Sequence, residues 1–98
     1  MDNNPVVERP KKRSDVIFRP LDDSWVLFDP GTEQLHVLNL SAALVWEFAD
    51  GETVVDGIAE AVGSAFDPPV SASQAMTDVR SALERFQEAG LLDPSPRS

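Results

Sequence analysis

The 98-residue sequence offers few side chains for catalysis or metal binding. It has no cysteine, which excludes thiolate metal sites, disulfides and cysteine nucleophiles, and its one histidine, His36, excludes any site that needs two imidazoles. A catalytic histidine needs a nucleophile or an orienting carboxylate nearby, and the sequence indicates neither beside His36. We therefore interpret His36 as a partly exposed strand residue or as a contact to a ligand.

The carboxylates are numerous but scattered. Asp22 and Asp23 are typical of a turn, whereas Glu84 and Glu88 lie one helical turn apart beside an apolar stripe and are expected to face solvent. A catalytic acid pair needs burial to separate its two pKa values, and nothing in the pattern indicates burial. The five glycines are dispersed, so no phosphate-binding loop is present. We expect no enzymatic activity, no metal and no cofactor.

The charge of the chain is negative and unevenly placed. The formal net charge is -9; residues 1–20 carry five basic and three acidic groups, and residues 21–98 carry three basic and fourteen acidic groups. Such a body repels nucleic acid and anionic lipid, so neither is an expected partner. The basic run at residues 11–13 is interpreted as a solvated tail, or alternatively as a docking tail for an acidic partner. With no long apolar run and no apolar signal core, the expected location is cytoplasmic.

The pattern predicts two tails around one domain. Residues 1–14 contain Pro5 and Pro10 and no hydrophobic period, which indicates a disordered N-terminal tail, and residues 93–98 form a C-terminal tail. Residues 15–92 form the domain.

Three strands are expected first, at residues 16–18, 25–28 and 33–38. The second is apolar on both faces, which favours a strand covered on both sides or one with a ligand groove on one side. Residues 21–24 and 29–32 are the turns, the latter a type II turn with Gly31 in its third position. Short turns imply an antiparallel sheet with the third strand at an edge, where Gln34, His36 and Leu38 face one way and Leu35 and Val37 the other.

Three helices are expected next. Asn39 or Ser41 caps the first, Thr53 the second and Ser71, with Gln74 in a capping box, the third. The third carries the apolar stripe 76, 79, 83 and 86 and ends at Gly90. Three strands followed by three helices predict an α+β fold in which the helices pack against a small sheet.

Several runs, taken in order, resemble one protein family. They are WVLFDPG at 25–31, LHVLNLSAALVW at 35–46, DGETV at 50–54, DV at 78–79 and FQEAGLL at 86–92. Together they resemble the PqqD family, the small peptide chaperones also called RiPP recognition elements. The resemblance covers residues 15–92.

The resemblance implies a winged-helix-turn-helix-like fold and a binding function without catalysis. Members bind the leader segment of a ribosomally synthesised precursor peptide as an extra strand on the third strand, beside the third helix. They present it to a maturation enzyme such as a radical SAM protein, a protease or a cyclase. An edge strand has unpaired N–H and C=O groups for such a partner. The residues expected to bind the peptide are Glu33, Gln34, Leu35, His36 and Val37 on the strand, and Asp78, Ala82 and Arg85 on the helix.

Three other interpretations remain open from sequence. A winged-helix architecture is shared with DNA-binding proteins, but a third helix with Arg80 and Arg85 against three acidic residues disfavours DNA. An adaptor or accessory enzyme subunit that binds no leader peptide fits the size and charge. The edge strand would also allow a homodimer through strand pairing.

Overall fold

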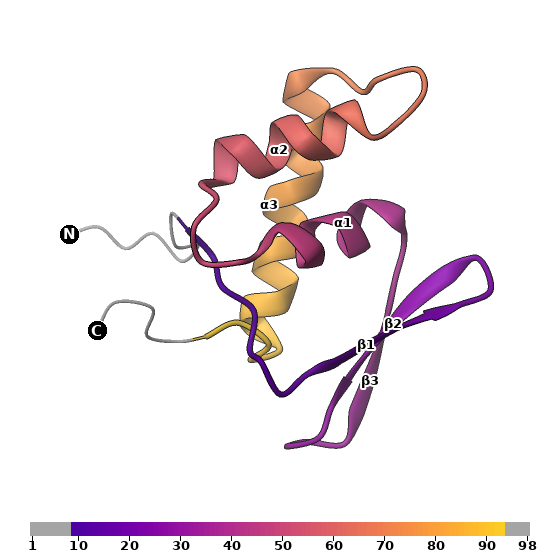
Figure 1. Cartoon of the computed structure of the whole chain (residues 1–98), viewed down its shortest axis with the longest axis vertical. Coiled ribbons are helices and arrows are strands. Elements are labelled where there is room, and N and C mark those ends of the chain that lie inside the picture. The colour runs from indigo at the N-terminus through magenta and orange to yellow at the C-terminus, as the bar shows by residue number, and fades with distance from the viewer. Residues whose placement is uncertain (1–8, 94–98) are drawn as a thin grey trace.

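The computed structural model describes residues 9–93, in which three strands are followed by three helices (Figure 1). The strands are β1 (Ile17–Leu21), β2 (Ser24–Asp29) and β3 (Gln34–Leu38). The helices are α1 (Leu40–Phe48), α2 (Val55–Ser64) and α3 (Ala72–Glu88). The predicted α+β architecture is confirmed. No helix in this part of the chain is long and apolar enough to cross a membrane.

The three strands form one antiparallel sheet in the order β1-β2-β3, so β3 lies at an edge, as predicted. Leu27 of β2 lies opposite His36 of β3. Leu27 and Leu38 are fully buried, whereas Leu35 and Val37 are 66% and 57% exposed. Because side chains alternate along a strand, His36 and Leu38 face the helices and Leu35 and Val37 face away, which confirms the predicted alternation.

The loop between β2 and β3 differs from the predicted type II turn. The left-handed residue is Glu33, with φ 62°, and Gly31 does not adopt a positive φ. The Glu33 N–H donates to the Asp29 carbonyl at 2.6 Å, and the Gly31 N–H donates to Oδ1 of Asp29 at 2.9 Å. The side chain of Asp29 therefore arranges the loop, which is why a prediction from proline and glycine positions alone was wrong.

Two helices begin at predicted caps. The Asn39 side chain accepts a hydrogen bond from the Ala42 N–H at 2.9 Å, and Ser71 Oγ accepts one from the Gln74 N–H at 3.2 Å. Each bond satisfies a donor that has no partner inside the helix. The cap of Asn39 fixes where β3 ends and α1 begins.

The predicted cap of the second helix was wrong. The N-cap of α2 is Val54, which makes no side-chain cap bond. Thr53 instead donates its N–H to Oδ1 of Asp50 at 2.9 Å and its hydroxyl to Oδ2 at 3.2 Å. The Asp50 carboxylate therefore binds Thr53 in the loop before α2. Gly51, at φ 84°, makes the tight turn after α1.

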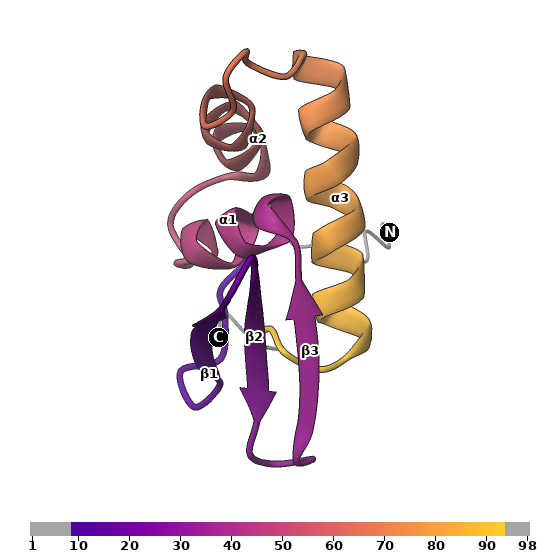
Figure 2. The same cartoon turned by 90° about the vertical axis from the view of Figure 1, so that its right-hand side faces the viewer.

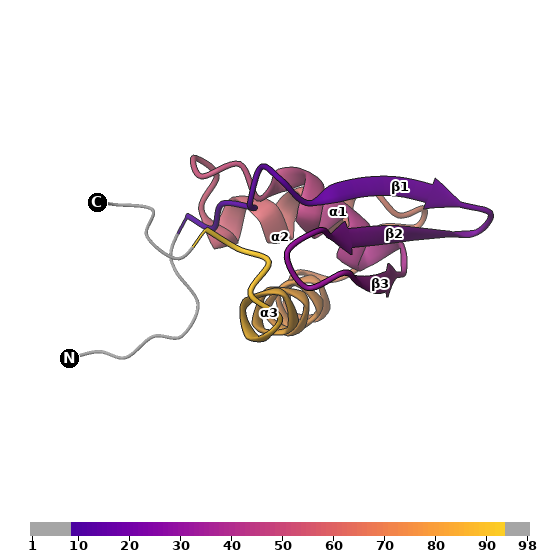
Figure 3. The ribbon, with the colours of Figure 1, turned by 90° about the horizontal axis from the view of Figure 1, so that it is seen from below.

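The hydrophobic core lies between one face of the sheet and the three helices (Figure 2). Trp46 of α1 packs edge-to-face on Phe86 of α3, with 5.3 Å between ring centroids and an interplanar angle of 78°. Burying each such large apolar side chain contributes about 1.5–3 kcal/mol. In Figure 3 α3 lies on the β3 side of the sheet. Yet no Cα atom of α3 comes within 8 Å of one in β3, because α3 packs on α1 and α2.

The segment before β1 departs from the expected disordered tail in the part that the structure describes. The Lys12 N–H donates to the Ala49 carbonyl at 2.9 Å, the Arg13 N–H to the Leu91 carbonyl at 3.0 Å, and the Gly51 N–H to the Pro10 carbonyl at 2.9 Å. Pro10 is fully buried. The segment packs because its backbone pairs with residues distant in sequence, which local composition does not reveal. Residues 1–8 and 94–98 lie outside the described residues.

Candidate functional site

The outer border of β3 presents backbone groups to solvent. The Val37 carbonyl accepts a hydrogen bond from Nη2 of Arg85 at 2.8 Å, so this carbonyl points away from β2. Backbone direction alternates along an antiparallel strand, so Leu35 and Val37 both direct their N–H and C=O groups outward. His36 and Leu38 then direct theirs toward β2. Two of the five predicted strand residues therefore offer main-chain partners to an added strand.

Within residues 9–93, no other backbone segment pairs with this border. The chain before β1 runs elsewhere, along Ala49, Gly51 and Leu91. A border covered by the chain itself would argue against strand addition. In the described structure only the side chain of Arg85 contacts its outward carbonyl groups.

A cavity of about 230 Å³, the α1–α3 groove, lies between the start of α1 and α3. It brings together the three predicted helix residues, Asp78, Ala82 and Arg85. Its remaining lining residues are Asn39, Ser41, Ala42 and Ser81. Sequence reasoning identified the α3 residues from their place beside the apolar stripe, but it did not connect the α1 cap to them. The i, i+3 spacing of Asp78 and Ser81 was an available signal, because it places both on one helix face.

The groove has an apolar floor and a polar rim. Ala82 is only 7% exposed and forms part of the core, while Arg85 is exposed. Oδ1 of Asp78 accepts a hydrogen bond from Nε2 of Gln74 at 3.0 Å. The Gln74 side chain therefore binds Asp78 instead of returning to the helix cap, so the expected capping box is only half formed. The groove offers a small hydrophobic surface between an acidic and a basic group.

The remaining predicted strand residues take different positions. Glu33 lies in the loop before β3 and is exposed, as is Gln34. His36 is half-buried on the helix-facing side of the sheet, and its Nε2 atom is buried without a hydrogen-bond partner among the described residues. An unpaired buried nitrogen costs stability, so His36 stands out within the site.

The outer face of the sheet is apolar and open. Ile17 and Leu21 of β1 and Leu35 and Val37 of β3 are all more than two-fifths exposed. The buried side chains of the sheet, among them Leu27 and Leu38, pack on the opposite face, where α1 comes close to β2 and β3. Of the two arrangements that sequence left open for β2, a sheet with one uncovered face is the one observed. A strand added beside β3 would widen this apolar face.

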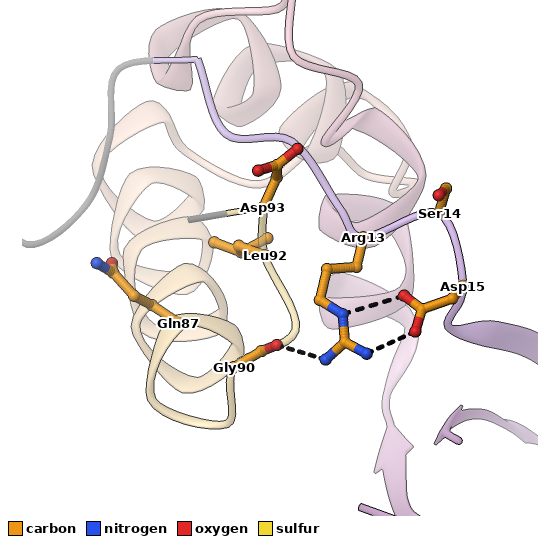
Figure 4. Close-up of a pocket in the computed structure, with 7 residues that line it drawn as sticks. All are labelled: Arg13, Ser14, Asp15, Gln87, Gly90, Leu92 and Asp93. Carbon is orange, nitrogen blue, oxygen red and sulfur yellow. Dashed lines mark hydrogen bonds and ion pairs between the residues drawn. The ribbon is translucent and has the colours of Figure 1, made fainter. Parts of the chain in front are cut away.

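A second, larger cavity of about 650 Å³ surrounds Arg13 (Figure 4). The guanidinium of Arg13 binds Asp15 at 2.7 Å and Asp29 at 3.1 Å, and it donates to the Gly90 carbonyl at 2.8 Å. Hydrogen bonds from Arg13 hold the pKa values of both carboxyls below their usual range, and the two carboxylates raise the pKa of Arg13. Arg13 thus joins the start of the domain to β2 and to the end of α3.

Sequence reasoning placed Arg13 in a solvated basic tail and missed this role. Asp29 is only 1% exposed, and a buried carboxylate needs a cation or several donors. The sequence signal for this ion pair was Asp29 itself, a single acidic residue at the end of an apolar strand. The partner could not be chosen from sequence, because Arg13 lies sixteen residues away. We assign this cluster to stability and not to ligand binding, since its donors are already used within the chain.

The comparisons with known proteins agree with this architecture. The family described as "Coenzyme PQQ synthesis protein D (PqqD)" matches residues 24–92. The solved structure described as "TbiB1 in Complex with the TbiA(beta) Leader Peptide" is similar in fold, with a TM-score of 0.70 and 20% sequence identity over 86% of this chain and 95% of that chain. A search of curated protein sequences gives no match. Because the family match spans well over half of the sequence, the chain belongs to the PqqD family.

Proposed function

We propose that this chain is a non-catalytic module that binds the leader segment of a ribosomally synthesised precursor peptide by strand addition to β3. The observation that carries the proposal is the outward-facing backbone of Leu35 and Val37 beside the α1–α3 groove. Family membership and the leader peptide named in the TbiB1 complex support it.

The energetics of strand addition suit a reversible contact. Each new main-chain hydrogen bond contributes roughly 0.5–1.5 kcal/mol, and ordering a flexible peptide opposes this by a comparable total. Burial of two or three apolar leader side chains, at about 1.5–3 kcal/mol each, then decides the balance. The expected affinity is micromolar, about -8 kcal/mol.

The two groups of site residues have different roles in this proposal. Within residues 33–37, Leu35 and Val37 supply main-chain pairing, which carries no sequence information. Asp78, Ala82 and Arg85 supply specificity, because the leader side chains that face α3 enter the groove these residues line. Ala82 leaves room for a side chain, and the two charged residues select the charge of its neighbours.

In this proposal the chemistry comes from another protein. Among residues 9–93 no three His, Cys, Asp or Glu side chains are grouped so as to hold a metal ion, and His36 has no hydrogen-bonded nucleophile or carboxylate. We therefore infer that the bound leader is presented to a maturation enzyme such as a radical SAM protein, a protease or a cyclase.

The proposal predicts a short precursor-peptide gene beside the gene for this chain, and the test is resonance mapping with that peptide. We expect chemical-shift changes at residues 33–38 and 75–86, and slower amide exchange at Leu35 and Val37. Shifts concentrated on α2, or no binding below about 100 μM, would contradict the proposal, because an affinity that weak falls well short of the micromolar contact expected. A partner enzyme that binds the chain equally well without any peptide would favour an adaptor.

A further inference from the structure

The side chain of Arg85 bridges α3 and β3. No Cα atoms of these two elements lie within 8 Å of one another, and yet Nη2 of Arg85 donates to the Val37 carbonyl at 2.8 Å. Holding a long side chain in one conformation costs conformational entropy, and the hydrogen bond to Val37 offsets part of this cost in the free chain. The Val37 carbonyl lies on the border of β3 that is not paired with β2, so the Arg85 bond occupies an acceptor on that free border.

An added strand would require the same oxygen. A ladder strand beside β3 directs its N–H groups at the outward carbonyls of Leu35 and Val37. A carbonyl oxygen has two lone pairs, so the competition in this proposal is for the space beside Val37, which the guanidinium of Arg85 fills in the free chain and the added strand would enter. When the backbone wins, the guanidinium of Arg85 loses its acceptor while it stays at the rim of the groove.

In the free chain the guanidinium of Arg85 binds no carboxylate of the described residues, although Glu88 lies three residues further along the same helix. Arg13 contacts two carboxylates, whereas Arg85 makes no ion pair within 4.0 Å. The acid on the same rim, Asp78, lies seven residues earlier on α3, about 10 Å along the helix axis. No other lining residue of the groove is basic. A carboxylate on the peptide would give the displaced Arg85 a partner at the groove itself, which Glu88 does not line.

Resting on the proposed function, we propose that Arg85 determines specificity by exchanging acceptors. In the free chain Arg85 caps the Val37 carbonyl. In the complex the leader backbone takes that carbonyl, and Arg85 binds a carboxylate that the leader carries beside Val37. The exchange selects leaders with Asp or Glu at one position, and it shields the border from pairing with other chains until such a leader arrives.

The experiment uses a displayed library of random 20-residue peptides selected on the intact chain. The selected peptides are expected to share an acidic residue, and one is synthesised with Glu and with Gln at that position. Wild type should bind the Glu form about twofold to fivefold more tightly, the range of an exposed ion pair. Arg85→Met should lose this preference and bind the Gln form at least as tightly as wild type does, because no guanidinium then fills the space beside Val37.

Arg80→Met is the matched control, since Arg80 lies on the same helix, is exposed and does not line the groove. It should keep the preference for the Glu form. Arg85→Glu should select peptides with Lys or Arg in place of the acid. In the free chain, the carbonyl resonance of Val37 should shift in Arg85→Met and not in Arg80→Met.

The outcomes separate the two proposals. Peptides that bind β3 with equal affinity for Glu and Gln forms, or a preference that survives Arg85→Met, overturn the role of Arg85 and leave strand addition intact. Selected peptides that leave the resonances of β3 unchanged overturn strand addition, and the role of Arg85 with it.

Discussion

Replacing Leu35 with proline tests strand addition at a single backbone atom. The Leu35 N–H points away from β2, so its removal breaks no bond within the sheet. Proline is tolerated on an edge strand when the missing N–H would face solvent. The Leu35 side chain is 66% exposed, so its loss removes little packing. Leu35→Pro should therefore fold, while His36→Pro, which removes a bond to β2, should be much less stable.

The effect on peptide binding follows from the lost donor. The leader carbonyl that would accept from Leu35 becomes buried without a partner, which costs about 1–3 kcal/mol, or roughly fivefold to 150-fold in Kd. Leu35→Ala keeps the N–H and removes the side chain, so the ratio of the two variants isolates the backbone term. Titration calorimetry with the gene-neighbour peptide gives both Kd values, and urea unfolding verifies the fold. Equal Kd values for Leu35→Pro and Leu35→Ala would refute the main-chain pairing.

Four further predictions, on three substituted positions, concern stability. Arg13→Met should lower the urea midpoint of unfolding more than Arg19→Met, because only Arg13 neutralises the buried Asp29; equal midpoints would contradict that role. The carboxyl pKa of Asp29 is lower in the folded chain than in the unfolded chain, where it is about 3.9. The stability from this ion pair is therefore present above pH ~3.9 and is lost as the pH falls through the folded pKa. Arg13→Met should weaken the decrease of stability at acid pH. His36→Leu should raise the free energy of unfolding by about 1 kcal/mol, since it removes an unpaired buried nitrogen. If urea denaturation gives a lower free energy of unfolding for the variant, Nε2 has a partner. Gly90→Ala should cost about 1–2 kcal/mol in thermal unfolding, because φ is 73° and nothing obstructs a Cβ atom, and Gly90→Asn should cost less.

Local patterns predicted the elements that depend on local forces. The alternation in residues 34–38 identified both faces of β3, because burial of one face requires it. Ser71 was predicted as a cap and Asn39 as one of two candidates, since a short polar side chain before an apolar run satisfies helix donors. Thr53 is not the cap because α2 begins one residue later, with Val54 as its N-cap, and the Thr53 hydroxyl is directed at Asp50.

The parts that sequence reasoning missed depend on contacts between distant residues. Arg13 and Asp29 are sixteen residues apart, and Arg85 and Val37 forty-eight. The α1–α3 groove exists because α3 crosses the start of α1, so Ser41 and Ser81 line the same groove although they are forty residues apart in the sequence. Periodicity assigns a residue to a face, and only the packing of two elements shows which faces meet.

The sheet has two borders, and their residues explain why β3 is the one that should receive a peptide. The border at β1 includes Pro20, which has no N–H to donate, and the charged Arg19, and both features discourage strand pairing. The strand β3 has neither proline nor lysine nor arginine, and its outward carbonyl at Val37 is covered only by the side chain of Arg85 among the described residues. A side chain can leave at the cost of one exchanged hydrogen bond, whereas a missing N–H cannot be supplied. One border is therefore closed by its covalent structure, and the other by a contact that a suitable peptide can displace.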